Sequence, residues 1–146
     1  MERTFINLAK EPSRGIEALK GTRVPAVFSD AVRVQLKECA LLFISGKVGL
    51  KDDNTLADRT MREQTRQTLE NIRAVLAREG GTMDDIVRVR VYVTQVDSAS
   101  LRDIHDVRSE FWTQGKYPAS TLVRVDQLIR DGALIEIDAD AVLPAS

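Results

Sequence analysis

Residues 133–143 read ALIEIDADAVL. Every odd-numbered position from 133 to 141 is apolar, whereas three of the even-numbered positions carry the carboxylates of Glu136, Asp138 and Asp140. Successive side chains of a strand point to opposite faces of a sheet, so this alternation predicts a strand with one buried face and one polar face.

Two other segments show the same alternation. In residues 119–127, Thr121, Val123 and Val125 would share one side. The expected opposite side holds Ser120, Leu122, Arg124 and Asp126. In residues 86–94 the expected apolar side holds Val87, Val89, Val91 and Val93. We therefore predict a sheet with one apolar face for helices. The predicted polar face carries Arg88, Arg90, Tyr92, Leu122, Arg124, Asp126, Glu136, Asp138 and Asp140.

Two helices are predicted, over residues 58–79 and 99–112, because apolar residues there recur three or four positions apart. Asp58 is the expected N-cap of the first helix, and the glycines at 80–81 are its expected end. Residues 5–8 form a short apolar stretch, and residues 11–25 are expected to be a loop. Strands are expected from Ala31 onward, with residues 40–44 forming a strand covered on both faces. The resulting order predicts an α+β fold with two helices on one face of a sheet.

Composition limits the possible functions. The 146 residues contain no repeat or linker, which predicts a single domain over 1–146. Nucleic acid is not the expected partner, because the net charge is -1 and only 5% of residues are aromatic. No membrane partner is expected, since the longest apolar run is far below the ~20 residues that cross a bilayer. One Cys and one His exclude Cys-rich and His-rich metal sites. The lone thiol, Cys39, indicates a reducing, cytoplasmic location.

The polar sheet face has two interpretations. It is either the solvated side of an antiparallel sheet or an interface between subunits. Apolar residues interrupt its charges, and only two helices are available to cover the sheet. Both features favour the interface, with a ligand cleft between subunits.

His105 is the only histidine of the chain. It lies at the margin of the apolar stripe of the second predicted helix, four residues after Leu101 and near Trp112. One interpretation is a packing residue. The other is a proton carrier, which requires Glu136 or water within hydrogen-bond reach. No phosphate loop, dinucleotide fingerprint or serine-hydrolase elbow is present.

Several local strings occur in a recognisable order. They are FSDAVR (28–33), LFISG (42–46), QTRQTLENI (64–72), DIVR (85–88), YPAS (117–120) and IEIDA (135–139). Together they resemble the reactive intermediate/imine deaminase family, also called RidA or YjgF. The likeness runs from about residue 24 to residue 143, so residues 1–23 form a less family-like segment.

This resemblance implies a chorismate-mutase-like α+β subunit. It also implies a homotrimer in which the polar sheet faces form an inner barrel, with ligand clefts between neighbours. The implied activity is the hydrolysis of an enamine or imine, such as 2-aminoacrylate, to a keto acid and ammonia, without metal or organic cofactor. The implied partner is therefore a small-molecule carboxylate.

The resemblance also assigns site residues. Glu136 matches the family glutamate that positions water, while Ser120 stands where an arginine grips the substrate carboxylate. Phe28 replaces a frequent Tyr, His105 an Asn and Leu122 a Cys. The expected catalytic residues are therefore Glu136 and His105.

The expected substrate contacts are Ser120, Arg124, Phe28, Ser45, Gly46 and Leu122. Because Ser120 cannot supply a guanidinium, Arg124, four residues further on, is the expected substitute. It would suit a longer dicarboxylate, such as a ring-cleavage enamine of the 2-aminomuconate type. The missing arginine also leaves open a non-catalytic, regulatory trimer that binds a small metabolite or a protein partner. The ribonuclease label attached to this family is disfavoured by the balanced charge.

Overall fold

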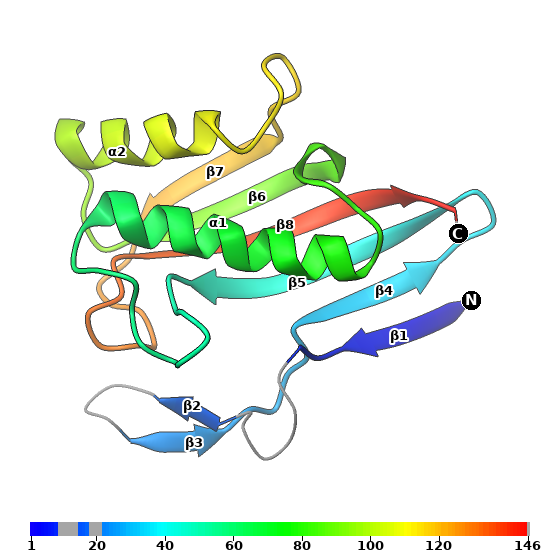
Figure 1. Ribbon diagram of the computed structural model, residues 1–146, viewed down its shortest axis with the longest axis horizontal. Helices are drawn as coiled ribbons and strands as arrows, with labels where there is room; N and C mark the ends of the chain where they lie inside the picture. The colour runs from blue at the N-terminus through cyan, green and yellow to red at the C-terminus, as the bar shows by residue number, and fades with distance from the viewer. Residues whose placement is uncertain (9–14, 18–21, 146) are drawn as a thin grey trace.

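The computed structural model describes residues 1–8, 15–17 and 22–145. Its main sheet has six strands in the order β1-β4-β5-β8-β6-β7 (Figure 1). Its strands are β1 (Glu2–Ile6), β4 (Ala31–Gln35), β5 (Cys39–Val48), β6 (Ile86–Val93), β7 (Ala119–Arg124) and β8 (Ile135–Pro144). Neighbouring strands are antiparallel except for β6 and β7, which are parallel, so the sheet is mixed. A separate two-stranded sheet pairs β2 (Gly15–Glu17) with β3 (Arg23–Pro25).

Both α-helices of the described residues cover the same face of the main sheet (Figure 1). They are α1 (Met61–Arg78) and α2 (Ser98–Ser109), and a short 3-10 helix, η2 (Met83–Asp85), lies between them in the chain. The α+β prediction, with two helices on one face, is confirmed. In this part of the chain neither helix is both long and apolar enough to cross a membrane.

The ends of α1 differ slightly from the prediction. Thr60, not Asp58, is the N-cap, and its hydroxyl accepts a hydrogen bond from the Glu63 amide. Asp58 instead accepts a bond from the Arg59 amide. Gly80 adopts the left-handed region at φ 78°, which lets the Gly81 amide reach back to the Leu76 carbonyl and end the helix.

The alternation of β8 sets the core. Its odd-numbered residues from 135 to 141 are all buried against the helices, as predicted, and Leu143 is buried as well. From α1, Leu69, Ile72, Val75 and Leu76 complete this core with no exposed surface. The even-numbered side chains of β8, including Glu136, therefore lie on the face without helices.

The predicted orientation of β7 is wrong. Its residues Ser120, Leu122 and Arg124 pair with Val89, Val91 and Val93 of β6. These valines are buried beneath the helices, and residues directly opposite each other in a sheet point the same way. Ser120, Leu122 and Arg124 therefore lie on the helix side, away from Glu136. The parallel pairing to β6 causes this, and the sequence of an isolated strand does not reveal it.

Two further predictions about burial are wrong. Val87 is half exposed, because a register shift between Ile86 and Arg88 turns it out of the apolar face. In β5, Phe43 is 45% exposed on the helix-free face, so this strand is not covered on both faces within one chain. The N-terminal apolar stretch overlaps β1, which pairs with β4. The segment predicted as a loop contains more strand than expected, since β2 and β3 both lie inside it and pair with each other.

Candidate functional site

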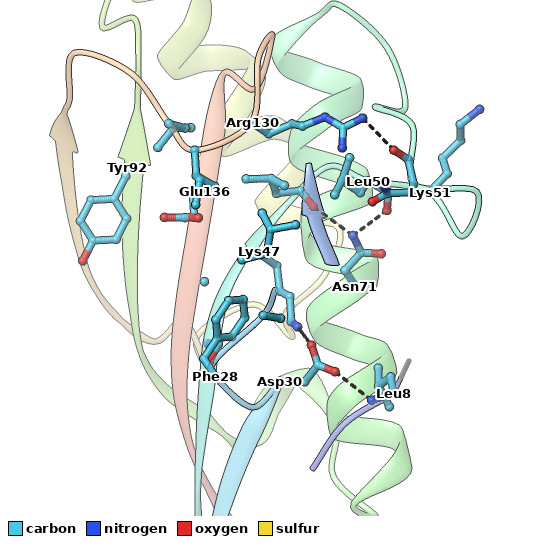
Figure 2. A pocket seen from close by; sticks show the side chains of 18 of the residues that line it. Leu8, Phe28, Asp30, Lys47, Leu50, Lys51, Asn71, Tyr92, Arg130 and Glu136 are labelled. Carbon is cyan, nitrogen blue, oxygen red and sulfur yellow. Dashed lines mark hydrogen bonds and ion pairs between the residues drawn. The ribbon is translucent and has the colours of Figure 1, made fainter. Parts of the chain in front are cut away.

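A large cavity lies where β5 departs from regular pairing with β8. Its volume is about 860 Å³. The register of β5 shifts between Ile44 and Lys47, so Ser45 and Gly46 form a bulge in a continuing strand. The cavity is bounded by this bulge, by residues 26–30, by residues 127–130 and by Glu136 (Figure 2). Four predicted site residues share it: Phe28, Ser45, Gly46 and Glu136.

Glu136 sits at the wall of this cavity against the backbone of Gly46. A Cβ atom on Gly46 would lie 2.9 Å from Glu136 Cδ, so the absence of a side chain at position 46 makes room for the carboxyl group. Burial raises the pKa of Glu136, and the charge of nearby Asp138 raises it further. The carboxyl group can therefore hold or release a proton closer to neutral pH than an exposed glutamate.

A polar network lies next to Glu136 on β6 and β8. Tyr92 stands directly across from Glu136 in the sheet, and its hydroxyl donates to Asp138 at 3.3 Å. Arg90 bonds both Asp138, at 2.7 Å, and Asp140, at 3.0 Å. The pKa of Tyr92 is raised by burial and by the Asp138 carboxylate, so its phenol stays protonated. Tyr92 also lines the cavity. Its position opposite Glu136 in the β6–β8 register is the signal that could have identified it as a site residue.

The segment around Phe28 is fixed to the bulge of β5. The Ser45 hydroxyl donates to the Ser29 carbonyl at 2.7 Å, and the Ser45 amide donates to the Asp30 carbonyl at 2.9 Å. Lys47 forms an ion pair with Asp30, whose other oxygen accepts from the Leu8 amide at 2.8 Å (Figure 2). Ser45 thus acts first as a structural anchor of the cavity wall.

The far wall of the cavity carries residues that the sequence did not indicate. Arg130 donates to the Asn54 carbonyl at 2.8 Å. Asn71 of α1 donates to the carbonyls of Val48 and Leu50 and so holds the end of β5 against the helix (Figure 2). These residues come from distant parts of the chain, and no local pattern links them to Glu136. The described residues contain no cluster of three or more His, Cys, Asp or Glu side chains suited to a metal ion.

The family model described as Endoribonuclease L-PSP matches residues 22–143. The chain belongs to the RidA/YjgF family.

Individual relatives agree with this membership. The RutC family protein YjgH of Escherichia coli is 36% identical over 71% of this chain and 76% of its own. A protein of Dermatophagoides farinae named 2-iminobutanoate/2-iminopropanoate deaminase is 28% identical over 70% of this chain and 77% of its own. The crystal structure of a YjgF/YER057c/UK114 family member from Mycobacterium tuberculosis is 30% identical, has a TM-score of 0.69 and covers 97% of this chain and 100% of that one.

In this RidA/YjgF chain the remaining predicted site residues lie apart from Glu136. His105 is exposed on α2, and Ser120, Leu122 and Arg124 occupy the helix side of the edge strand β7. Arg124 donates to the Thr94 carbonyl at 3.3 Å. Partial burial lowers the pKa of His105, and the charge of Arg108 lowers it further, which favours a neutral imidazole. Within one chain, therefore, His105 and Glu136 are not brought together.

Proposed function

We propose that this protein is a hydrolase that converts a reactive enamine or imine to a keto compound and ammonia. The observation that carries the proposal is the partly buried carboxyl group of Glu136, with its raised pKa, at the wall of a large cavity. The family membership and the deaminase name of one relative support it. Hydrolysis of a C=N bond consumes one water and changes no oxidation state, so it requires no redox cofactor.

Glu136 would supply the proton transfers. In its neutral form it donates a proton to the enamine carbon or imine nitrogen and leaves an electrophilic iminium carbon. The resulting carboxylate then accepts a proton from the attacking water, giving a carbinolamine. The carboxyl group then returns this proton to the nitrogen, the C–N bond breaks to release ammonia, and the carboxylate accepts the hydroxyl proton, which leaves the carbonyl group of the product and a neutral Glu136. A carboxyl group whose pKa is raised suits both directions of transfer near neutral pH.

The active assembly would be a homotrimer with the site between subunits. His105 and Ser120 lie on the helix side at the β7 edge, whereas Glu136 lies on the helix-free side, so one chain cannot present them to one substrate. Large apolar side chains on the helix-free face also remain open, among them Phe5 at 64% and Phe43 at 45% exposure. If the β7 edge of one subunit closes the Glu136 cavity of the next, His105 and Ser120 reach the same substrate as Glu136. The exposed apolar side chains of the helix-free face would then be covered by the neighbouring subunit. In that cleft Phe28 and Gly46 would contact substrate from one side, and His105, Ser120 and Leu122 from the other.

The cavity volume favours a longer substrate as a second candidate. About 860 Å³ is within the range that holds drug-sized ligands, far more than a three-carbon imino acid needs. A ring-cleavage enamine of the 2-aminomuconate type would use this space. Arg124 is no longer the candidate for its second carboxylate within the same subunit, because Arg124 points to the helix side.

Ammonia release from freshly generated imino acids and ring-cleavage enamines tests the proposal. The wild type and Glu136→Gln should differ by about 10²-fold or more in kcat, the usual contribution of a positioned acid–base group. Equal rates would remove Glu136 from the mechanism. Ligand-induced stabilisation by keto acids without any ammonia release would instead identify a binding protein.

A further inference from the structure

Helix α2 contains a cation that the subunit does not pair. Arg108 is 9% exposed, and no hydrogen bond or ion pair joins its guanidinium to any residue in the described part of the chain. The guanidinium carbon lies 5.8 Å from the ring centre of Trp112, near the limit of a cation–π contact. Burial alone lowers the pKa of Arg108, with no carboxylate to oppose it.

Such a group is costly unless an anion joins it. Arginine has five N–H donors and no acceptor, and a buried charge without a partner is strongly destabilising. Two other arginines at the α1–α2 interface, Arg62 and Arg66 of α1, do have acidic partners. Arg62 pairs with Asp103 and Asp106, and Arg66 pairs with Glu110. Close to Arg108, the indole nitrogen of Trp112 is also a buried donor without an acceptor. Among the described residues, the surroundings of Arg108 and of the Trp112 indole therefore lack a negatively charged acceptor.

The position of Arg108 on α2 shows where that acceptor would enter. Asp103, Asp106 and Glu110 mark the flank of α2 that faces α1. Arg108 lies on the opposite flank, since it is separated from those three residues by about half a helical turn. His105 lies about 60° further round the helix from Arg108, on the side turned to solvent. In Figure 1, α2 runs over β7, the edge of the sheet. The helix side of β7 carries Ser120, which is exposed and has the position of the expected substrate-binding arginine.

We propose that Arg108 holds the substrate carboxylate in place of the arginine that is absent at Ser120. The inference rests on the proposed deaminase site and identifies its ligand class as a small carboxylate. The guanidinium would come from α2 instead of β7. Because Arg108 follows His105 by about one helical turn, both side chains would line the same edge of the cleft. The Arg108 nitrogens, unlike Trp112 Nε1, are not fully shielded from solvent, so a carboxylate can reach them. An incoming carboxylate would supply the missing acceptor and form charge-assisted, bidentate hydrogen bonds.

Trp112 provides a direct measurement, because it is the only tryptophan of the chain and lies under Arg108. The assembled full-length protein is titrated with 2-oxobutanoate, a keto-acid product, and with 2-butanone, which lacks the carboxylate, while Trp112 fluorescence is followed. The wild type should bind 2-oxobutanoate saturably and 2-butanone much more weakly. The Arg108→Met variant should raise the Kd for 2-oxobutanoate at least tenfold. The control Arg102→Met removes an exposed arginine of the same helix and should leave the Kd unchanged.

Unfolding of the ligand-free variants separates a binding role from a structural one. Arg108→Met should unfold at the same or a higher temperature than the wild type, because an apolar side chain replaces an unpaired buried charge. A clear loss of stability together with an unchanged Kd would overturn the proposal. Dissociation of the oligomer with unchanged affinity would also overturn it, because the partner of Arg108 would then be a protein carboxylate.

The failure of this inference is distinguishable from the failure of the proposed function. If ammonia release depends on Glu136 but Arg108→Met binds 2-oxobutanoate like the wild type, only the role of Arg108 is wrong. If 2-oxobutanoate binding requires Arg108 but Glu136→Gln retains full activity, the role of Arg108 stands and the proposed mechanism does not. In an active enzyme, Arg108→Met should raise KM more than it lowers kcat.

Discussion

The carboxyl group of Glu136 occupies the space that a side chain at Gly46 would fill. An added Cβ would lie 2.9 Å from Glu136 Cδ and 3.1 Å from Glu136 Cγ. The bulge in β5 brings the backbone this close, so the position of the proposed acid–base group depends on one glycine of the neighbouring strand.

We expect Gly46→Ala to displace Glu136 and to lower ammonia release by about tenfold or more, since misplacement of a catalytic group by 1 Å can cost about 10²-fold. The reason is steric, because the contacting atoms belong to a side chain that must rotate away. A double-mutant cycle checks this. Adding Gly46→Ala to Glu136→Gln should cause little further loss, whereas fully additive effects would show that Gly46 acts independently of Glu136.

The raised pKa of Glu136 predicts a pH dependence of stability. Since the folded state binds this proton more tightly than the unfolded state, wild-type stability falls as the pH rises from below the ordinary glutamate pKa through the raised folded pKa. Glu136→Gln removes this loss. The variant should therefore gain free energy of unfolding relative to the wild type between pH 4 and pH 7.5.

Denaturant unfolding at both pH values measures that gain, and the exposed Glu38→Gln substitution is the control. A Glu136→Gln difference that is the same at pH 4 and pH 7.5 would contradict the buried, proton-retaining environment.

Gln64 predicts a different kind of effect, on stability alone. Its amide is fully buried and makes three hydrogen bonds, two that tie α1 to residues 132–134 before β8 and one to the segment just before α1. It donates to the carbonyls of Asp58 and Gly132 at 2.9 Å each and accepts from the Leu134 amide at 2.7 Å. Gln64→Leu leaves all three backbone groups unpaired, at about 1–3 kcal/mol each, so we expect a loss of roughly 3 kcal/mol or more.

Gln67→Leu is a matched control for Gln64→Leu on the same helix, because Gln67 is only half-buried and makes one side-chain bond, to Asn71. The Gln67→Leu variant should lose less than about 1 kcal/mol of its free energy of unfolding, measured by the same chemical denaturation. Similar losses in the two variants would mean that the buried amide does not connect α1 to residues 132–134.

The sequence predicts a strand's orientation where burial differs strongly between its two faces, and fails where strand pairing sets the orientation. The alternation of residues 133–143 identifies the buried face of β8 correctly, because a central strand under two helices has a strong burial contrast. For β7 the same rule fails, since most of its side chains are exposed on both faces and its orientation comes from parallel pairing with β6. Val87 is misassigned because a bulge interrupts the period of two.

The candidate site divides in the same way. Phe28, Ser45, Gly46 and Glu136 are found from local strings and do line one cavity. Tyr92 requires the strand register, and Asn71 and Arg130 require tertiary packing, so sequence patterns do not identify them. Arg108 is an informative case, because it lies between buried apolar residues of α2 and no sequence pattern links it to the site. Its lack of a charged partner becomes visible when the contacts of α2 are known.

The exposed Phe43 tests the proposed assembly. It lies on the helix-free face between Val32 on β4 and Asp140 on β8. Phe43→Lys places a cation opposite Asp140, so the isolated subunit should stay folded while an apolar interface on this face is disrupted. Sedimentation velocity should show the trimer of the wild type converted to smaller species, with ammonia release reduced in parallel. Leu36→Lys changes a similarly exposed apolar residue in the β4–β5 turn and should leave the assembly intact. An unchanged trimer in Phe43→Lys would mean that subunits do not meet through this face.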